Sequence, residues 1–574
     1  MNQNERKTVL HRMLLLIAVA CVIMGLYAMR LIFLQLVNGD DFKAKATNTT
    51  DYNFTVTAAR GDIVDSAGRR IATTATSYNV VLNKLLMGDE DLDGMLQKIV
   101  ELLRANGESW NDTLLISQPD AAGNYTFTAE EGSTRDQKAL AAMKDNLGLQ
   151  QYATANDVME KLVEDYDLAS YPLSWQRTLG GIHYEMQLQA FSNVNNFIMA
   201  ENVSEATVAT IKEHSLSLPG VEIVETSTRS YEQSTVLPHV LGRVGKITAE
   251  KWKVTDENGQ TTYPLRDKGY NMNDVIGISG LESAYEDELR GKDGVETITR
   301  NSDGVIVSTA MTTVPEPGHT VQLTVNSDFQ KAVEQALGKN IDMISRAYGT
   351  DGARANAGAV VVLDVKDGSV MAASNYPSYD QNLYASNYSE YSSDPSLPLF
   401  NRALQGLYTP GSTFKVLTLA SALENGLATL DTTYDSPGRM EIGGADVVSI
   451  GERGHGKISL AKAFALSSNT VFGQVADGLG AEKLVATARA FGYGQQLGLD
   501  FTTAASVMPN PEEMTEWELA WAGAGQPVGQ GHTPGPQATV MQNALMAATI
   551  ANNGIAMNPY VVGQILAPDG TVVK

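Results

Sequence analysis

The chain has 574 residues and a formal net charge of −24 at pH 7, long enough for several domains and a large core. The acidic balance argues against nucleic acid as a partner, because binding it requires clustered Lys and Arg against the phosphates. Cys21 is the only cysteine, so the remaining sequence has no disulfide and no cysteine metal site. We expect neither a metal nor a cofactor.

The N-terminal region contains a largely apolar run of 17 residues, 13–29, which is at the short end of what crosses a bilayer. Three basic residues precede it, and the positive-inside rule then places the N-terminus in the cytoplasm. A cleaved signal peptide and a lipoprotein cut before Cys21 are the alternatives, but apolar residues continue past both sites. We expect a cytoplasmic tail at 1–12 and a single-pass membrane anchor at 13–37.

The segment 59–69 is the first predicted hairpin, with a short strand at Ile63 and Val64 and a turn at 67–68. Asp62 and Asp65 suggest a metal site only weakly, because no further ligands stand at loop spacing. A turn is the simpler interpretation.

From about 85 to 218 the pattern is mostly helical. Apolar residues keep helical period over 92–103 and stop at Gly107. Thr154 and Asp157 have the spacing of a capping box at the start of another helix.

After Gly318 the pattern changes. A strand is predicted at 321–325, a helix starts at Asp328, and a strand at 359–365 returns through the turn 366–368.

Ser412 and Lys415 form a Ser-x-x-Lys motif after the turn Pro410-Gly411, at the start of a predicted helix. Positions i and i+3 share a helix face, so the lysine lies beside the hydroxyl. A serine needs an adjacent base to become nucleophilic, and a lysine is a base only when it is neutral. On this motif alone, an N-cap role for Ser412 stays an alternative. The second match, at Ser459, is interpreted as a helix N-cap.

Two further motifs accompany Ser412. Ser467-Ser468-Asn469 is a Ser-x-Asn at the end of an apolar helix, and Gly529-Gln530-Gly531 follows downstream. Another Ser-x-Asn, at 77–79, lacks such surroundings and is interpreted as a turn. Together with 401–403 and 408–415, these motifs resemble the active-site boxes of class B penicillin-binding proteins.

Three other segments resemble the non-catalytic pedestal of the same family: 59–69, 229–242 and 277–291. The resemblance implies that Arg60, Arg229 and Glu282 meet in space, which we interpret as a structural ion-pair network that must be fully paired if buried. Segment 277–294 resembles the cell-elongation branch, which maintains cell shape, more than the septal branch.

The resemblance implies an α+β fold. Its expected parts are a transmembrane helix, a β-rich pedestal over 38–318 with a helical insertion at about 85–218, and a penicillin-recognising transpeptidase domain over 319–574. In that domain an antiparallel sheet is flanked by helices, and the active serine lies in the cleft between them.

The implied activity is that of a peptidoglycan D,D-transpeptidase. By the resemblance, Ser412 attacks the carbonyl between the two terminal D-alanines of a stem peptide, Lys415 takes the serine proton, and Ser467 relays a proton to the leaving D-alanine. Asn469 would bind the substrate, with Gly529, Gln530 and Gly531 beside it. β-Lactams would acylate Ser412. The implied partners are stem peptides, a membrane glycan polymerase and other cell-wall machinery, outside the cell membrane.

The family's third box, Lys-Thr-Gly or Lys-Ser-Gly, does not occur in the sequence. The chain stops in a predicted hairpin, 560–573, so we expect the natural gene to continue and supply that box. Three rivals remain: a D,D-carboxypeptidase or β-lactamase, a β-lactam sensor, and a non-catalytic scaffold of the cell-wall machinery. An authentic end at Lys574 would favour the scaffold.

Overall fold

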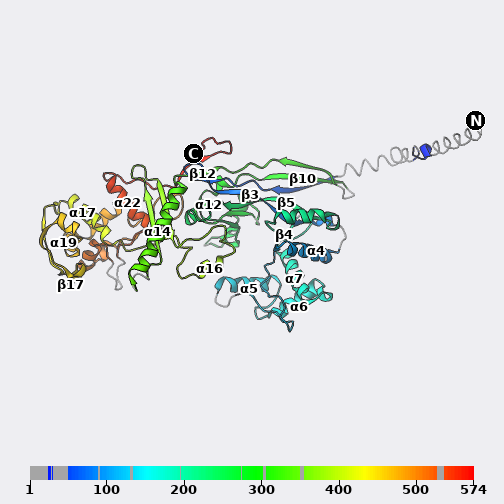
Figure 1. Cartoon of the computed structure of the whole chain (residues 1–574), viewed down its shortest axis with the longest axis horizontal. Helices are drawn as coiled ribbons and strands as arrows, with labels where there is room; N and C mark the ends of the chain where they lie inside the picture. The colour runs from blue at the N-terminus through cyan, green and yellow to red at the C-terminus, as the bar shows by residue number, and fades with distance from the viewer. Residues whose placement is uncertain are drawn as a thin grey trace, which may run out of the picture. The chain divides into compact units, whose positions relative to one another are not determined.

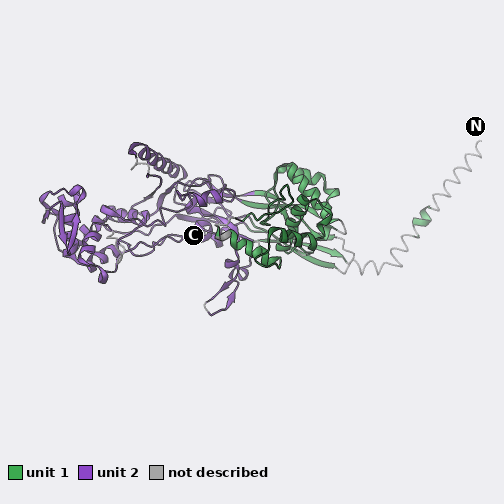
Figure 2. Ribbon diagram, turned by 90° about the horizontal axis from the view of Figure 1, so that it is seen from below, with its two compact units in different colours: residues 1–58, 76–228, 292–316 green, residues 59–75, 229–291, 317–574 purple. Residues whose placement is uncertain are grey.

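The structure is a computed structural model that describes residues 23–27, 29, 49–87, 91–129, 133–193, 195–256, 258–272, 274–301, 306–349, 354–526 and 535–574. The predicted anchor at 13–37 lies mostly outside these residues. Among the described residues, no helix has the length and apolar character needed to cross a membrane. The fold is α+β, and the chain forms two compact units, coloured separately in Figure 2.

Unit 1 comprises residues 1–58, 76–228 and 292–316. Its three-stranded antiparallel sheet has the order β1-β10-β11. The strands that lie mainly in this unit are β1 (Thr49–Val56), β4 (Phe197–Ala200), β5 (Val221–Tyr231), β10 (Gly294–Asn301) and β11 (Ile306–Thr313). Its helices, several of them labelled in Figure 1, are α3 (Lys84–Met87), α4 (Leu92–Ala105), α5 (Thr134–Asn146), α6 (Ala155–Asp165), α7 (Leu173–Leu188) and α8 (Glu205–Glu213), with short 3-10 turns η2 (Leu168–Ser170) and η3 (Ser215–Ser217).

The predicted helical character of 85–218 is confirmed. Helix α4 buries Leu96, Ile99 and Leu103 in one core, as expected from their period. The capping box also forms, with Thr154 accepting from the Asp157 N–H and the Asp157 carboxylate accepting from the Thr154 N–H. These caps and the buried faces explain why the region folds as a helical layer.

The prediction of a turn at Ser77 is wrong. Ser77 lies within β3 (Arg70–Leu82), is buried, and donates from Oγ to Asn202 Oδ1 at 2.6 Å. The strand forms because β3 is rich in β-branched residues, which favour a pleated surface, and the buried hydroxyl finds a side-chain acceptor.

Unit 2 comprises residues 59–75, 229–291 and 317–574. Its sheet joins β19 (Val562–Leu566), β12 (Thr320–Leu323), β2 (Ile63–Val64) and the start of β3, in that order. Strand β12 pairs antiparallel with β19 and parallel with β2, so it ties the first hairpin to the last strand of the chain. The predicted hairpin over 359–372 is confirmed as β13 (Gly358–Leu363) and β14 (Val370–Tyr376).

Helices and short strands complete unit 2. Helix α14 (Ser327–Ala347), labelled in Figure 1, begins at the N-cap Asn326 and packs against β14. The helices that carry or support the serine motifs are η4 (Gly411–Phe414), α17 (Lys415–Glu424), α18 (Leu460–Ala465), α19 (Asn469–Leu479), α20 (Ala481–Ala490), α21 (Glu516–Gly523) and α22 (Val540–Ala551). The remaining short elements are α9 (Pro238–Leu241), β6 (Val244–Lys246), α10 (Ala249–Trp252), β7 (Val254–Thr255), β8 (Thr261–Thr262), α11 (Pro264–Asp267), β9 (Val275–Gly277), α12 (Gly280–Ala284), α13 (Glu286–Leu289), α16 (Tyr388–Ser393), β15 (Thr433–Ser436), β16 (Arg439–Ile442), β17 (Ala445–Val448), η5 (Ile450–Glu452), β18 (Gly456–Ser459) and η6 (Pro511–Glu513).

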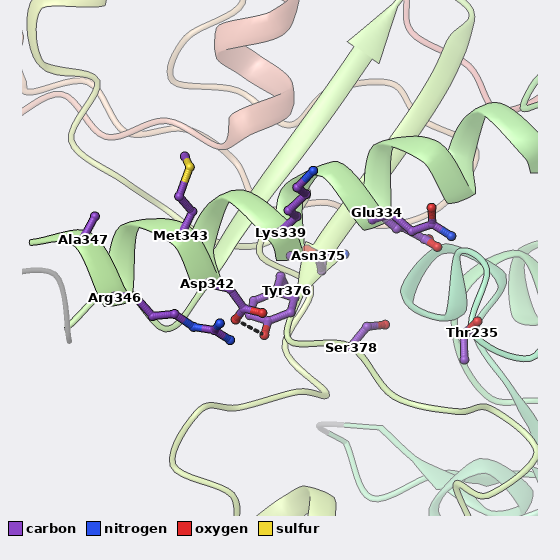
Figure 3. Close-up of a pocket in the computed structure, with 12 residues that line it drawn as sticks. Thr235, Glu334, Lys339, Asp342, Met343, Arg346, Ala347, Asn375, Tyr376 and Ser378 are labelled. Carbon is purple, nitrogen blue, oxygen red and sulfur yellow. Dashed lines mark hydrogen bonds between the residues drawn. The ribbon is translucent and has the colours of Figure 1, made fainter.

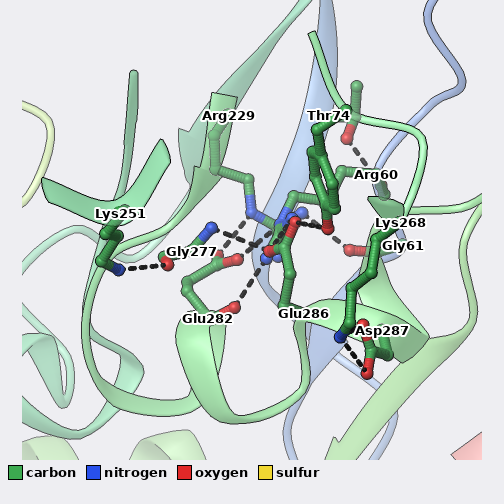
Figure 4. A network of polar contacts seen from close by, with 11 residues as sticks. Arg60, Gly61, Thr74, Arg229, Lys251, Lys268, Gly277, Glu282, Glu286 and Asp287 are labelled. Carbon is green, nitrogen blue, oxygen red and sulfur yellow. Dashed lines mark hydrogen bonds and ion pairs between the residues drawn. The ribbon is translucent and has the colours of Figure 1, made fainter. Parts of the chain in front are cut away.

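The three charged residues predicted to form a network lie together in unit 2 (Figure 4). Glu282 is fully buried on α12, and its two carboxylate oxygens each accept from one arginine Nε at 2.7 Å, from Arg60 and from Arg229. A fourth residue that sequence reasoning missed, Glu286, pairs with Arg60 Nη1 at 2.7 Å. The backbone carbonyls of Glu282 and Gly61 accept from the two guanidiniums as well, so two cations and two anions balance here. Arg229 Nη2 is buried without a hydrogen-bond partner among the described residues.

Removal of the central carboxylate should therefore destabilise the fold strongly. We expect Glu282→Ala to lower the free energy of unfolding by about 3–5 kcal/mol, because Arg229 keeps a buried charge without a carboxylate. Urea unfolding of the purified protein measures this. Glu316→Ala is the matched control, since its ion pair with Lys292 is exposed and its removal should lower the free energy of unfolding far less. Equal losses in the two variants would contradict a buried network.

Candidate active site

Ser412 is positioned by a tight glycine contact at the start of its helix. Gly411 has a φ of +56° and donates its N–H to the carbonyl of Gly525 at 2.9 Å. Gly525 also has a positive φ, +73°, and a Cβ there would lie 2.0 Å from the Gly411 oxygen. Only glycine fits both requirements. Ser412 then lies in the 3-10 turn η4, and its residue is exposed.

The last residue of the turn is Phe414, which is fully buried. Its ring packs edge to face against the Tyr493 ring, with 5.5 Å between the centroids. This contact fixes the helix that continues as α17, with Lys415 as its first residue. Lys415 is only 1% exposed. Its ammonium group therefore lies inside the protein while the neighbouring serine stays accessible.

Lys415 Nζ lies within hydrogen-bond distance of four oxygens. It is 2.6 Å from Asn469 Oδ1, 2.8 Å from the Ser467 carbonyl, 3.0 Å from Ser467 Oγ and 3.2 Å from Ser412 Oγ. An ammonium has three N–H donors, and a neutral amine has two donors and a lone pair. The two shortest contacts satisfy the donors of the neutral amine, and its lone pair is then available to the hydroxyls.

Burial lowers the pKa of Lys415 from its usual value of 10.5 to about 8. Desolvation disfavours the charged form, and none of the four oxygens is a carboxylate that would restore it. At pH 7 about one molecule in ten then carries the neutral amine. Lys415 is therefore a feasible general base for Ser412.

Ser467 joins the other two groups from a second segment. It lies between α18 and α19 with a φ of +53°, a left-handed conformation that is uncommon for a residue with a side chain. Ser468 next to it caps α19 by accepting from the Val471 N–H. This geometry directs the Ser467 hydroxyl to Ser412, where it donates to Oγ at 2.8 Å. Such strain concentrates at functional sites.

Asn469 forms a hydrogen bond to Lys415, and a second hydrogen bond orients its own side chain. Its Oδ1 accepts from Nζ, and its Nδ2 donates to the Val448 carbonyl on β17 at 2.9 Å. The side chain is thus oriented by a strand, and one amide hydrogen remains for the predicted contact with a substrate. That contact stays a prediction.

The structure thus brings together Ser412, Lys415, Ser467 and Asn469. Gly529, Gln530 and Gly531, also predicted at the site, lie outside the described residues. The N-cap role of Ser459 is confirmed, because its side chain accepts from the Lys462 N–H at 3.2 Å. Sequence reasoning missed the supports Gly525 and Val448, which belong to no motif and act through backbone atoms. Only the glycine-rich run around Gly525 was a usable signal.

A pocket of about 930 Å³ lies elsewhere, along α14 (Figure 3). Its lining includes Asp342, Met343 and Tyr376, whose hydroxyl donates to Asp342 Oδ1 at 3.4 Å. None of the four residues grouped around Lys415 lines it. We therefore assign the site from the arrangement of nucleophile and base rather than from cavity size.

Two family models match this chain. One, described as the penicillin-binding protein dimerisation domain, matches residues 55–323, and the penicillin-binding protein transpeptidase domain matches 358–573. The peptidoglycan D,D-transpeptidase MrdA of Escherichia coli strain K12 is 32% identical over 384 residues, covering 65% of this chain and 57% of the relative. The chain thus spans a little over half the length of this curated relative.

Two solved structures share the fold. A penicillin-binding protein PBP2 in complex with MreC, from Helicobacter pylori, matches with a TM-score of 0.62, 20% identity and coverage of 90% of this chain and 79% of that one. A chain from a peptidoglycan synthase complex that coordinates polymerization and crosslinking matches with a TM-score of 0.59 and 24% identity, covering 97% of this chain and 79% of that one.

The order of a dimerisation domain followed by a transpeptidase domain with a serine–lysine site defines the class. The chain belongs to the penicillin-binding proteins, and the predicted resemblance to class B is confirmed.

The low pKa of Lys415 leads to a pH prediction. Because the base is the neutral amine, acylation of Ser412 by a fluorescent penicillin should accelerate as pH rises, with an inflection near pH 8. Asn469→Asp places a carboxylate beside Nζ, which raises the lysine pKa and moves the inflection to higher pH. Stopped-flow labelling across about pH 6–10 measures both.

Asn425→Asp, at the far end of α17, is the matched control and should leave the inflection near 8. A rate that does not change with pH in the parent protein would exclude Lys415 as the base.

Proposed function

We propose that this protein is a peptidoglycan D,D-transpeptidase that cross-links stem peptides through a serine acyl-enzyme. One observation carries the proposal: Ser412 Oγ lies between Lys415 Nζ at 3.2 Å and Ser467 Oγ at 2.8 Å. A nucleophile next to a neutral base and a second hydroxyl is the arrangement that acyl transfer needs. The names of the transpeptidase domain and of the MrdA relative support the same reaction.

In the first half-reaction, Ser412 Oγ forms a bond to the carbonyl carbon between the two terminal D-alanines, and its proton passes to Lys415. Ser412 is the second residue of η4, and N–H groups in a first helical turn have no intrahelical acceptor. We assign its N–H to the developing oxyanion. The C–N bond then breaks as Ser467, which bridges Lys415 and Ser412, delivers the proton to the leaving D-alanine.

In the second half-reaction, an amine of a neighbouring stem peptide attacks the acyl carbon. The amine loses a proton to the Lys415–Ser467 pair, and the Ser412 oxygen leaves and takes that proton back. A new amide bond replaces the D-alanyl amide, so the exchange needs no external energy source. A β-lactam would acylate Ser412 in the same way, because its strained amide opens on the same nucleophile.

The proposed location is the outer side of the cell membrane, with the 13–37 segment as a single-pass anchor. The apolar run and the preceding basic residues support it. We also propose that the protein works with a membrane glycan polymerase and the other cell-wall machinery, in elongation rather than septation. Two similar structures, one of a complex with MreC and one of a peptidoglycan synthase complex, support that assignment.

The proposed topology has a direct test. A protease added to cells stripped of their wall should digest the regions after the anchor and leave residues 1–12 protected. A mature protein that begins at or after Cys21, determined by N-terminal sequencing, would contradict the anchor.

The two Ser-x-x-Lys motifs provide a matched test of the mechanism. Ser412→Ala should abolish covalent labelling by a fluorescent penicillin, because it removes the nucleophile. Ser459→Ala should label normally and lose only about 1 kcal/mol of stability with its N-cap. Gel fluorescence and urea unfolding measure the two effects. Labelling that survives in Ser412→Ala would exclude this site.

A further inference from the structure

Three buried hydroxyl groups form a chain beside the segment that carries Ser467 and Asn469. Ser436, the last residue of β15, is fully buried, Ser468 is 2% exposed, and Thr470 on α19 is fully buried. Ser436 Oγ lies 2.9 Å from Ser468 Oγ, which lies 3.1 Å from Thr470 Oγ1. Thr470 Oγ1 donates to the carbonyl of residue 437 at 2.9 Å. The chain of contacts thus starts and ends at two adjacent residues, 436 and 437.

The count of donors fixes the direction of these hydrogen bonds. Each hydroxyl has one hydrogen to donate and can accept two bonds. Thr470 donates its hydrogen to the Pro437 carbonyl, which can only accept, so Thr470 Oγ1 accepts from Ser468 and, at 3.4 Å, from Ser449. Ser468 therefore accepts from Ser436, as well as from the backbone N–H that it caps. The hydrogen bonds run in one direction, from Ser436 through Ser468 and Thr470 to Pro437.

The residues that alternate with these hydroxyls are the ones that contact Lys415. Ser467 precedes Ser468, and its carbonyl and hydroxyl oxygens lie 2.8 and 3.0 Å from Lys415 Nζ. Asn469 stands between Ser468 and Thr470, and its Oδ1 lies 2.6 Å from the same nitrogen. Three of the four oxygens around the amine thus belong to a segment whose other residues are bonded to the end of β15.

We propose that Ser436, Ser468 and Thr470 are positioning residues for the base Lys415. Through them the end of β15 holds the hydrogen-bond partners of Nζ in place. The inference rests on the proposed function, because the position of the amine matters only if Lys415 activates Ser412.

Buried hydroxyls suit this task for two physical reasons. A hydroxyl that loses its partner away from water is unfavourable, so a chain in which every hydrogen is donated favours one arrangement of the segment. The hydroxyls are also uncharged, so they orient the segment without bringing a carboxylate that would stabilise the ammonium of Lys415. A misplacement of about 1 Å can cost about 100-fold in rate, so a small gain in order at Nζ is worth having.

A purely structural role is the alternative, in which the chain only fastens α19 to β15. A second contact between the same two elements separates the two roles. Gln474 on α19 donates from Nε2 to the carbonyl of Asp435 on β15 at 2.8 Å. The helix therefore stays attached to the strand when the hydroxyl chain is broken, and the effect on Lys415 can be measured by itself.

Thr470→Val tests the chain, because valine has nearly the same shape as threonine and lacks the hydroxyl. Stopped-flow labelling of the full chain over a range of concentrations of a fluorescent penicillin separates two constants, the dissociation constant of the noncovalent complex and the rate constant of acylation. We expect Thr470→Val to lower the acylation rate constant by about tenfold or more and to change the dissociation constant less. Thr470→Ser keeps the hydroxyl and should restore most of the rate.

Thr549→Val is the matched control. Thr549 on α22 is also buried and donates from Oγ1 to a backbone carbonyl at 2.8 Å, but it has no part in the chain. Its loss of thermal stability should resemble that of Thr470→Val, while both labelling constants stay at the parent values.

Ser436→Ala is a second, independent break in the chain. It removes only the first donor and should also slow acylation, and it carries the test if Thr470→Val does not fold. A variant with both substitutions should be no slower than Thr470→Val alone, because residues of one network do not act additively.

Three results would overturn the inference. The first is an acylation rate constant at the parent value in Thr470→Val or, if that variant does not fold, in Ser436→Ala. The second is a Thr470→Ser variant as slow as Thr470→Val, which would assign the effect to the lost packing of a methyl group. The third is a change confined to the dissociation constant. Failure of the proposed function is distinct, since it appears as labelling that survives in Ser412→Ala.

Discussion

The site depends on the burial of one lysine. Burial removes water from around the Lys415 ammonium. The four oxygens that take its place near Nζ are all neutral: two hydroxyls, a carbonyl and an amide. These oxygens stabilise the charged ammonium less than water does, which is why the pKa of Lys415 falls to about 8. In the proposed mechanism Ser412 becomes a nucleophile only through this balance, since a serine hydroxyl is a weak nucleophile at its free pKa.

Elsewhere in the same unit, the buried cations lie against charged carboxylates instead of neutral oxygens. Arg60 and Arg229 lie against the carboxylates of Glu282 and Glu286. Each guanidinium donates to a carboxylate oxygen of Glu282, and such ion pairing suits a contact that only has to persist. A carboxylate of that kind beside Lys415 would stabilise the ammonium and remove the base. The difference between a structural and a reactive cation in this protein therefore lies in the charge of the oxygens around it.

The sequence was sufficient where a pattern is local. Helical period over 92–103, the Thr154 capping box and the hairpin at 359–372 depend on neighbours in the chain, and all three are confirmed. The motif residues at 412, 415, 467 and 469 could be named because their chemistry is tied to residue type. Ser77 was mispredicted because Ser-x-Asn is common in turns, while its partner Asn202 is 125 residues away. Glu286 was missed for the same reason, since nothing in its own segment indicates that Arg60 reaches it.

What the sequence could not supply is the support that fixes these groups in place. The Ser412 turn rests on the backbone of Gly525, the Lys415 amine on the carbonyl of Ser467, and Asn469 on the carbonyl of Val448. Backbone oxygens occur at every residue, so no spacing or composition marks the ones that matter. They bring three distant segments, around 411–415, 448 and 467–469, to a common point, and small displacements of any one would change the hydrogen bonds to Nζ. Because those bonds decide where the lysine proton resides, the reactivity proposed for one exposed serine depends on backbone geometry spread over more than one hundred residues of the fold.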